Sequence, residues 1–188
     1  MGSYMEKMEK IETNDVIKGA FAGLVAGLVA TVVMTEFQSL VNKMSEDKKK
    51  HKSKQKEKKE PATVKAAEMI SESVFDHELT KSEKKIAGPA MHYAMGATSG
   101  LIYGISSEVA PITTVGAGLP FGAAVWLVAD DVAVPALGLS KSPTEFPLST
   151  HAYALSSHLV YGLTTDLVRR LLRSLLSARK FAAQHSEI

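Results

Sequence analysis

The sequence predicts an all-α membrane protein: a bundle of four transmembrane helices, with a Lys-rich polar loop and a short amphipathic helix between the first two spans. Charge is sharply segregated, because residues 43–60 hold nine lysines whereas residues 19–34, 86–106 and 112–129 contain no Asp, Glu, Lys or Arg. Small residues recur every four positions in the apolar stretches, a spacing that lets helices approach closely in lipid. The alternative fold is a soluble helical bundle with unusually Gly-rich helices.

The first predicted span covers about residues 16–41. A helix crosses a bilayer core with about 20 apolar residues, and this stretch is long enough to do so. Its small residues form a ladder with a four-residue spacing: Gly19, Gly23, Gly27, Thr31 and Thr35. We interpret the ladder as the face on which this helix packs against another helix.

A polar connection follows the first span. Residues 43–60 contain the run KKKHKSKQKEKK, which is typical of a solvated, disordered segment. Its lysines could contact anionic lipid headgroups. No aromatic residue lies between them to stack on bases, which argues against nucleic-acid binding. Residues 62–78 follow Pro61 and carry an apolar stripe, so we expect an amphipathic helix on the membrane surface or against the bundle.

The second predicted span covers about residues 82–106 and opens with a capping-box pattern, Thr80 followed by Glu83. Its small residues again repeat every four positions, with one histidine in the series: Gly88, His92, Gly96, Gly100 and Gly104. His92 is therefore expected on the face where helices touch rather than on the lipid face.

The third span is predicted over about residues 113–134, with Pro120 permitting a kink. A loop punctuated by Pro and Gly, residues 135–149, leads to the fourth span at about 150–167. One face of the third span carries Gly118, Gly122, Trp126 and Asp130, and one face of the fourth carries Ala154, His158, Gly162 and Asp166. Arginines after the fourth span suit a headgroup position.

Each predicted span carries an ionisable residue that marks a candidate site: Glu36, His92, Asp130 and His158. Such side chains are costly in a bilayer and usually face the interior of a bundle. When the spans alternate in direction, all four residues fall at a similar depth near the same membrane face, so we expect one polar cluster. Asp131 and Tyr161 are possible supporting residues.

A purely structural role is the alternative for these residues. Intramembrane His and Asp side chains often form hydrogen bonds across helices that only fix the packing. Of the adjacent carboxylates, Asp130 and Asp131, one is expected to point away from the cluster. Asp166 is expected to pair with Arg169 or Arg170 one turn later, and His151 is expected on the surface near the loop.

Several functions are compatible with this cluster. It could bind or exchange protons or another ion, since histidine titrates near neutral pH. Its two imidazoles and two carboxylates could instead hold a divalent metal, or His92 and His158 could ligate haem b. The chain could also be a non-catalytic scaffold or membrane partner subunit, or a homo-oligomer. No nucleophile–base pair, phosphate loop or redox thiol is visible in the sequence, so an enzyme is not indicated.

The distribution of positive charge predicts the orientation in the membrane. Fourteen of the 22 Lys and Arg residues lie on the side of the Lys-rich loop and eight on the side of the termini. Because cytoplasmic loops are enriched in Lys and Arg, the Lys-rich loop is expected in the cytoplasm, although the arginines after the fourth span argue in the opposite direction.

Several motifs also resemble a known family. They are WLVADD at 126–131 leading to PALGLS at 135–140, HLVYG at 158–162, the Gly-rich stretch 19–27 running into MTE at 34–36, and the Gly-rich second span. This pattern is similar to that of the YagU-like (DUF1440) family of small bacterial inner-membrane proteins, and the resemblance covers the four spans but not the Lys-rich loop. It implies a multi-pass protein of a bacterial inner membrane. A link to acid tolerance has been suggested in the family, but it offers no established catalytic residues to carry over.

Overall fold

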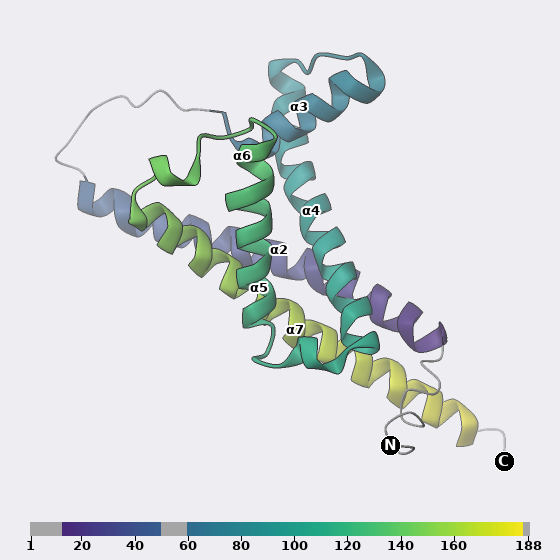
Figure 1. Cartoon of the computed structure of the whole chain (residues 1–188). Helices are drawn as coiled ribbons and strands as arrows, with labels where there is room; N and C mark the ends of the chain where they lie inside the picture. The colour runs from purple at the N-terminus through teal and green to yellow at the C-terminus, as the bar shows by residue number, and fades with distance from the viewer. Residues whose placement is uncertain (1–12, 50–59, 186–188) are drawn as a thin grey trace, which may run out of the picture.

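The computed structural model describes residues 13–49 and 60–185, with side chains for 13–45 and 60–177. The described part is helical throughout and contains no strand. Four long helical segments cross one another, and a shorter helix lies over one end (Figure 1). The elements are α2 (Thr13–Lys49), α3 (Ala62–Phe75), α4 (Lys81–Val109), η1 (Pro111–Thr114), α5 (Leu119–Trp126), the π-helix η2 (Leu127–Ala133), α6 (Val134–Ala136), η3 (Pro143–Glu145) and α7 (Leu148–His185).

The predicted glycine ladders are the contact between α2 and α4. A Cβ atom built on Gly23 would collide with the carbonyl oxygen of Gly100, and a Cβ on Gly100 would collide with that of Gly23. A Cβ on Gly27 would likewise collide with the carbonyl oxygen of Gly96, whereas a Cβ on Gly96 would meet the side chain of Thr31. The two backbones therefore touch directly at Gly23 and Gly100. The interpretation of both ladders as packing faces is confirmed.

A second backbone contact joins α5 to α7. A Cβ atom on Gly118 or Gly122 would collide with the carbonyl oxygen of Gly162 or His158, respectively. The two faces that the sequence pattern singled out on the third and fourth spans are therefore packed against each other.

The long helices alternate in direction. At one end of the bundle Arg173 Nη2 on α7 lies 3.2 Å from Asp15 Oδ1 on α2, and at the other end Asn42 Nδ2 on α2 lies 3.3 Å from Tyr153 Oη on α7. The helices α2 and α7 are thus antiparallel. The glycine contacts make α2 and α4 antiparallel as well, since the ladder residues pair in reverse order.

The segment from α5 to α6 is also antiparallel to α7. Its first residues pack at Gly162, whereas Asp131, near its end, lies 3.6 Å from His151 at the start of α7. Consequently α2 and the α5–α6 segment point in one direction, and α4 and α7 point in the other.

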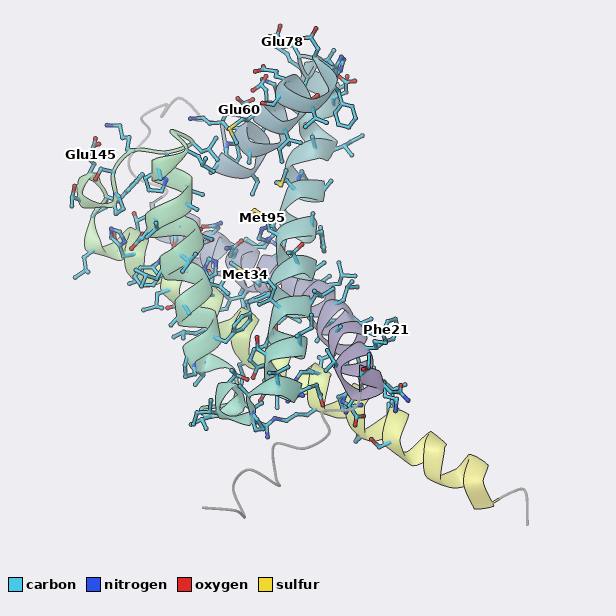
Figure 2. The ribbon with its side chains drawn as sticks, turned by 45° about the vertical axis from the view of Figure 1, so that its right-hand side comes forward. Phe21, Met34, Glu60, Glu78, Met95 and Glu145 are labelled. Carbon is cyan, nitrogen blue, oxygen red and sulfur yellow. The ribbon has the colours of Figure 1, made fainter. Side chains whose placement is uncertain are left out.

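Small residues fill the interior of the bundle and large apolar residues cover its outside. Ala22, Ala26 and Ala30 are completely buried. Large side chains such as Phe21 and Leu167 are more than half exposed, and Figure 2 shows Phe21 on the outer side of α2. This distribution is the reverse of that in a water-soluble core, which large apolar side chains normally fill.

Two helical segments are long and apolar enough to cross a membrane, Thr13–Ser45 and Leu119–Ala136. This holds for the described residues and rests on the length and composition of the helices. These two segments correspond to the first and third predicted spans.

The structure corrects three local expectations. The third helix begins at Leu119 rather than at 113, because Gly116, Ala117 and Gly118 all have positive φ angles that a helix cannot continue through. Pro120 therefore lies in the first turn of α5 and causes no kink. The Lys-rich loop begins later than 43, since α2 continues to Lys49; residues 50–59 lie outside the described part of the chain.

The short helix α3 lies over the end of the bundle from which the chain enters α4. Its predicted range of 62–78 is shortened to end at Phe75, where Asp76 adopts a left-handed conformation. Val64 packs against Gly88 of α4, and Lys65 Nζ donates a hydrogen bond of 3.1 Å to the carbonyl oxygen of Leu139. The capping box predicted at Thr80 is confirmed.

We expect Gly100→Leu to destabilise the fold and Thr98→Leu to change it little. Residue 98 is exposed on the same helix, whereas a side chain at 100 must separate two touching backbones. Overpacking of this kind costs about 1–3 kcal/mol or more. At ~2–4 °C per kcal/mol the fall in Tm is roughly 2–12 °C. Thermal unfolding of both variants in the same detergent measures the difference, and equal Tm values would contradict the backbone contact.

Candidate functional site

A cavity of about 280 Å³ lies among the helices, on the side of α3. Residues of α2, α3, α4, the η2–α6 segment and α7 line it, so all the long helical segments contribute to its wall. Three of the four predicted site residues, His92, Asp130 and His158, line this cavity, each from a different helical segment. Figure 2 shows Met34 and Met95, which also line it, in the space between α2, α4 and α5.

His158 and Asp130 form the closest titratable pair in the cavity. The Nδ1 atom of His158 lies 3.8 Å from Oδ2 of Asp130 and 2.9 Å from the carbonyl oxygen of Ala154. Because a carbonyl can only accept, Nδ1 carries the hydrogen of that shorter bond. Nε2 of a neutral His158 is therefore a hydrogen-bond acceptor. The side chain of Asp130 is 41% exposed, so its carboxylate is accessible to a ligand or to water.

His92 brings a third titratable group into the cavity from α4. Its Nε2 atom is buried and has no hydrogen-bond partner among the described residues. Such an atom is costly to bury unless a water or ligand satisfies it. His92 lines the cavity, whereas this nitrogen atom itself is enclosed by protein.

Tyr161 and Glu36 differ from the other predicted residues. The hydroxyl of Tyr161 donates a hydrogen bond of 2.6 Å to the carbonyl oxygen of Gly96, so it fixes α7 against α4 at the cavity wall. Glu36 is exposed on α2 and does not line the cavity. Its place on the cavity wall is taken by Gln38, which sequence reasoning did not consider.

A second cavity of about 260 Å³ lies next to the first, toward the loop between α6 and α7. Asp130 lines both cavities, and Asp131 and His151 line the second. Asp131 Oδ1 is 3.6 Å from Nδ1 of His151, whose Nε2 lies 3.0 Å from the carbonyl oxygen of Pro143.

Both adjacent carboxylates face α7, but only Asp130 lines the main cavity; Asp131 points away from that cluster toward His151, as expected for one member of the pair. They lie in the π-helix η2, where wider turns reduce the angle between successive side chains. His151 is half-buried rather than on the surface. Two His–Asp pairs therefore lie two turns apart along α7.

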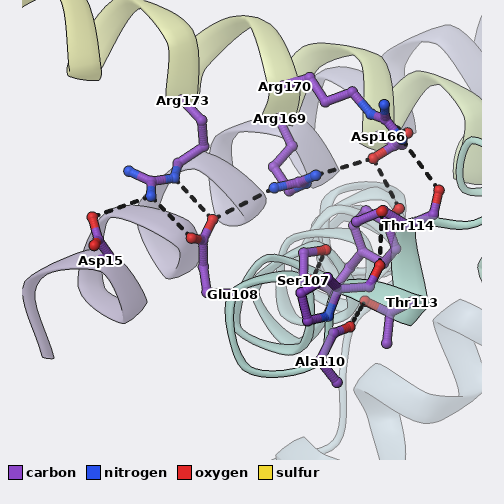
Figure 3. A network of polar contacts seen from close by, with 12 residues as sticks. Asp15, Ser107, Glu108, Ala110, Thr113, Thr114, Asp166, Arg169, Arg170 and Arg173 are labelled. Atoms are coloured by element: carbon purple, nitrogen blue, oxygen red, sulfur yellow. Dashed lines mark hydrogen bonds and ion pairs between the residues drawn. The ribbon is translucent and has the colours of Figure 1, made fainter. Parts of the chain in front are cut away.

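A separate network of ion pairs closes the opposite end of the bundle (Figure 3). Asp166 is completely buried; it accepts hydrogen bonds of 2.9 Å from Tyr103 Oη and 2.7 Å from Arg170 Nε. Arg169 Nη2 lies 3.3 Å from the same carboxylate. The predicted pairing of Asp166 with the arginines one turn later is confirmed.

Two acidic residues that sequence reasoning missed extend this network. Glu108 accepts hydrogen bonds of 2.8 and 2.9 Å from Nε and Nη2 of Arg173, and Asp15 accepts a third from the same guanidinium. The bonds to Glu108 raise the pKa of Arg173 above its ordinary value, and Asp15 adds to the shift. Acid and base groups balance here, so we interpret the network as a structural clasp of α2, α4 and α7.

Within residues 13–49 and 60–185, no group of three or more His, Cys, Asp or Glu side chains is arranged to hold a metal ion. Of the predicted ligands, only His158 and Asp130 form a close pair.

Comparison with known proteins identifies one family. Residues 51–167 match the family described as "Protein of unknown function (DUF1440)". This range includes His92, Asp130 and His158, together with α3, α4, the α5–α6 segment and the first part of α7. No curated protein and no solved structure matches the chain.

We expect Asp166→Asn to destabilise the protein by about 3 kcal/mol, at the lower end of the range for breaking a buried ion pair, because Arg170 is half exposed. The substitution preserves size but removes the charge that faces Arg169 and Arg170. Titration with SDS in mixed micelles measures the free energy of unfolding. The exposed Glu72→Gln on α3 is the control, and equal stabilities of the two variants would refute the clasp.

Proposed function

We propose that this chain, which belongs to the DUF1440 family, crosses a membrane four times and binds and releases protons in the cavity between its helices. The observation that carries the proposal is the convergence of His92, Asp130 and His158, from three helical segments, on one cavity. We place the protein in a bacterial inner membrane with the Lys-rich loop in the cytoplasm, as the resemblance and the distribution of positive charge imply.

The directions of the helices support four spans rather than two. The two most apolar segments, α2 and α5–α6, run parallel to each other, and a chain that crosses twice in the same direction must return between the crossings. The returning segment is α4, which packs along α2 through the glycine ladder. The last helix, α7, is antiparallel to both apolar segments, which gives the fourth crossing.

The distribution of side chains supports the same conclusion. Residues 86–106 of α4 and 148–165 of α7 contain no Asp, Glu, Lys or Arg, although their many small and polar residues lower the mean hydropathy. Large apolar side chains face outward from all four segments, for example Val29, Ile102, Val128 and Leu163. Helices in lipid associate through small residues and close packing, as these do.

The chemistry of the cavity supports proton binding. A carboxylate in a mostly apolar space is stabilised by protonation or by a neighbouring positive charge. His92 and His158 line the same cavity, and an imidazole can bind a proton as well as a carboxylate can. The second cavity, with Asp131 and His151, lies between Asp130 and the loop between α6 and α7, and offers these groups a route to water on that side.

Cysteine labelling tests the number of spans. The chain contains no cysteine, so Ser73→Cys on α3 and Ser142→Cys in the loop before α7 each provide a single, exposed thiol. Four spans place the two positions on the same side of the membrane, whereas spanning by α2 and α5–α6 alone places them on opposite sides. We expect a membrane-impermeant maleimide to label both or neither in intact cells. Labelling of one alone would contradict the four-span arrangement.

Carbodiimide labelling tests proton binding at Asp130. Dicyclohexylcarbodiimide is apolar and reacts with carboxyl groups in their protonated form. We expect it to label Asp130 of the detergent-purified protein and the labelling to fall as the pH is raised, because the proton is then lost. Peptide mass spectrometry locates the adduct.

Two variants serve as the comparison. Asp130→Asn should remove this adduct. Glu36→Gln should leave it unchanged, since residue 36 lies outside the cavity although the sequence places it at a similar depth. If Asp130 remains unlabelled at every pH, or is labelled independently of pH, the proposed proton site is wrong.

A further inference from the structure

The lining of the main cavity is mainly apolar. Met34, Met95, Val125, Leu137 and Leu139 contribute side chains to it. Thioether side chains adapt to ligands of different shapes, and two methionines on opposite helices provide such a surface. Small-molecule sites commonly combine an apolar wall with a few polar groups that orient the ligand. The apolar lining of this cavity is therefore suited to the apolar part of a small molecule.

The charge in the cavity has one sign. Asp130 is the only Asp, Glu, Lys or Arg among the described residues that line it. The other polar groups in the wall are neutral or become charged only on protonation, as His92 and His158 do. The Tyr161 hydroxyl already donates its hydrogen bond to the carbonyl oxygen of Gly96. A ligand that fits this cavity should therefore be apolar with a single positive charge.

We propose that the cavity binds a small lipophilic cation against Asp130, in place of the proton. This inference rests on the proposed function and adds to it the chemical class of the ligand. A protonated Asp130 releases its proton to water as the cation enters, so one positive charge replaces the other and the carboxylate stays neutralised. A bare carboxylate in an apolar space is costly, which makes the two occupants mutually exclusive.

The affinity for such a cation should fall as the pH is lowered, because protonation removes the negative charge that attracts it. Neighbouring groups contribute to this dependence. Two titratable residues line the main cavity with Asp130: His92 on α4 and His158 on α7. Three more line the second cavity with it: Asp131 on η2, Lys141 in the loop before α7 and His151 on α7. Protonation of the imidazoles adds positive charge and acts in the same direction.

Protection from carbodiimide labelling tests this inference on the full chain in detergent. The probe is phenyltrimethylammonium, which carries a permanent positive charge and no acidic proton. Its neutral isostere, tert-butylbenzene, has the same shape without the charge. The cation at about ten times its dissociation constant leaves roughly one tenth of the sites free, so labelling of Asp130 should slow about tenfold.

Calorimetric titration provides the matching binding measurement. We expect phenyltrimethylammonium to bind wild type and Glu36→Gln equally and Asp130→Asn at least about tenfold more weakly. Equal protection by tert-butylbenzene, or undiminished cation binding by Asp130→Asn, would overturn the proposed ligand class. Asp130 that is labelled in a pH-dependent manner but not protected by the cation would overturn this inference alone and leave the proton site standing. Absence of labelling together with Asp130-dependent binding of the cation would overturn the proton site instead.

Discussion

The contact between the backbones of α2 and α4 is the constraint on which the arrangement of the bundle depends. Three glycines on each helix remove the side chains that would separate them, and the two helices cross closely there. Beyond Gly27 and Gly96 the facing residues become larger, with Met34 on α2 and His92 on α4. The helices therefore diverge toward α3, and the main cavity occupies the space that opens between them. The point at which the glycine ladders end therefore determines where α2 and α4 separate.

The two ends of the bundle use their charges differently. At the end where the chain enters α2, three arginines of α7 are matched by Asp15, Glu108 and Asp166 in direct contacts of 2.7–3.5 Å. At the other end the His–Asp distances are 3.6 and 3.8 Å, and the paired groups border cavities. Close ion pairs joined by several hydrogen bonds rigidify a structure, whereas looser pairs beside a cavity leave atoms that a proton or ligand can reach. This contrast is the physical reason for locating the site at the α3 end.

The sequence predicted the helices. Of the residues it singled out as a cluster with its supporting residues, His92, Asp130, His158 and Tyr161 line the main cavity, whereas Glu36 does not. Each residue of an α-helix turns by about 100°, so residues four positions apart are separated by about 400°, or 40° more than a full turn. A ladder with this spacing therefore rotates slowly around the helix axis. After Gly19, Gly23, Gly27 and Thr31, the face toward α4 continues at Met34 and Gln38, while Glu36 has rotated away. Glu36 was predicted because it is a charged residue at the end of an apolar stretch. The geometry of the helix instead turns Gln38 toward the cavity.

Other features could not be predicted because no local pattern specifies them. The partners Asp15 and Glu108 of Arg173 lie far from it in the sequence and come together only through the packing of three helices. The π-helix that turns both Asp130 and Asp131 toward α7 has no recognisable sequence signature here.

The chemistry of the site follows from the way the bundle is packed. Glycine and alanine residues, which carry no charge, form the contacts between the helices. Arg169, Arg170 and Arg173 pair with acidic residues at the opposite end of the bundle. Asp130 therefore has no permanent positive partner among the described residues of the cavity wall. Its negative charge must be neutralised by a proton, by a protonated imidazole of His92 or His158, or by a cation that enters from outside. Because only one of these is needed at a time, the proposed proton site and the proposed cation site are two alternative ways to neutralise the same carboxylate.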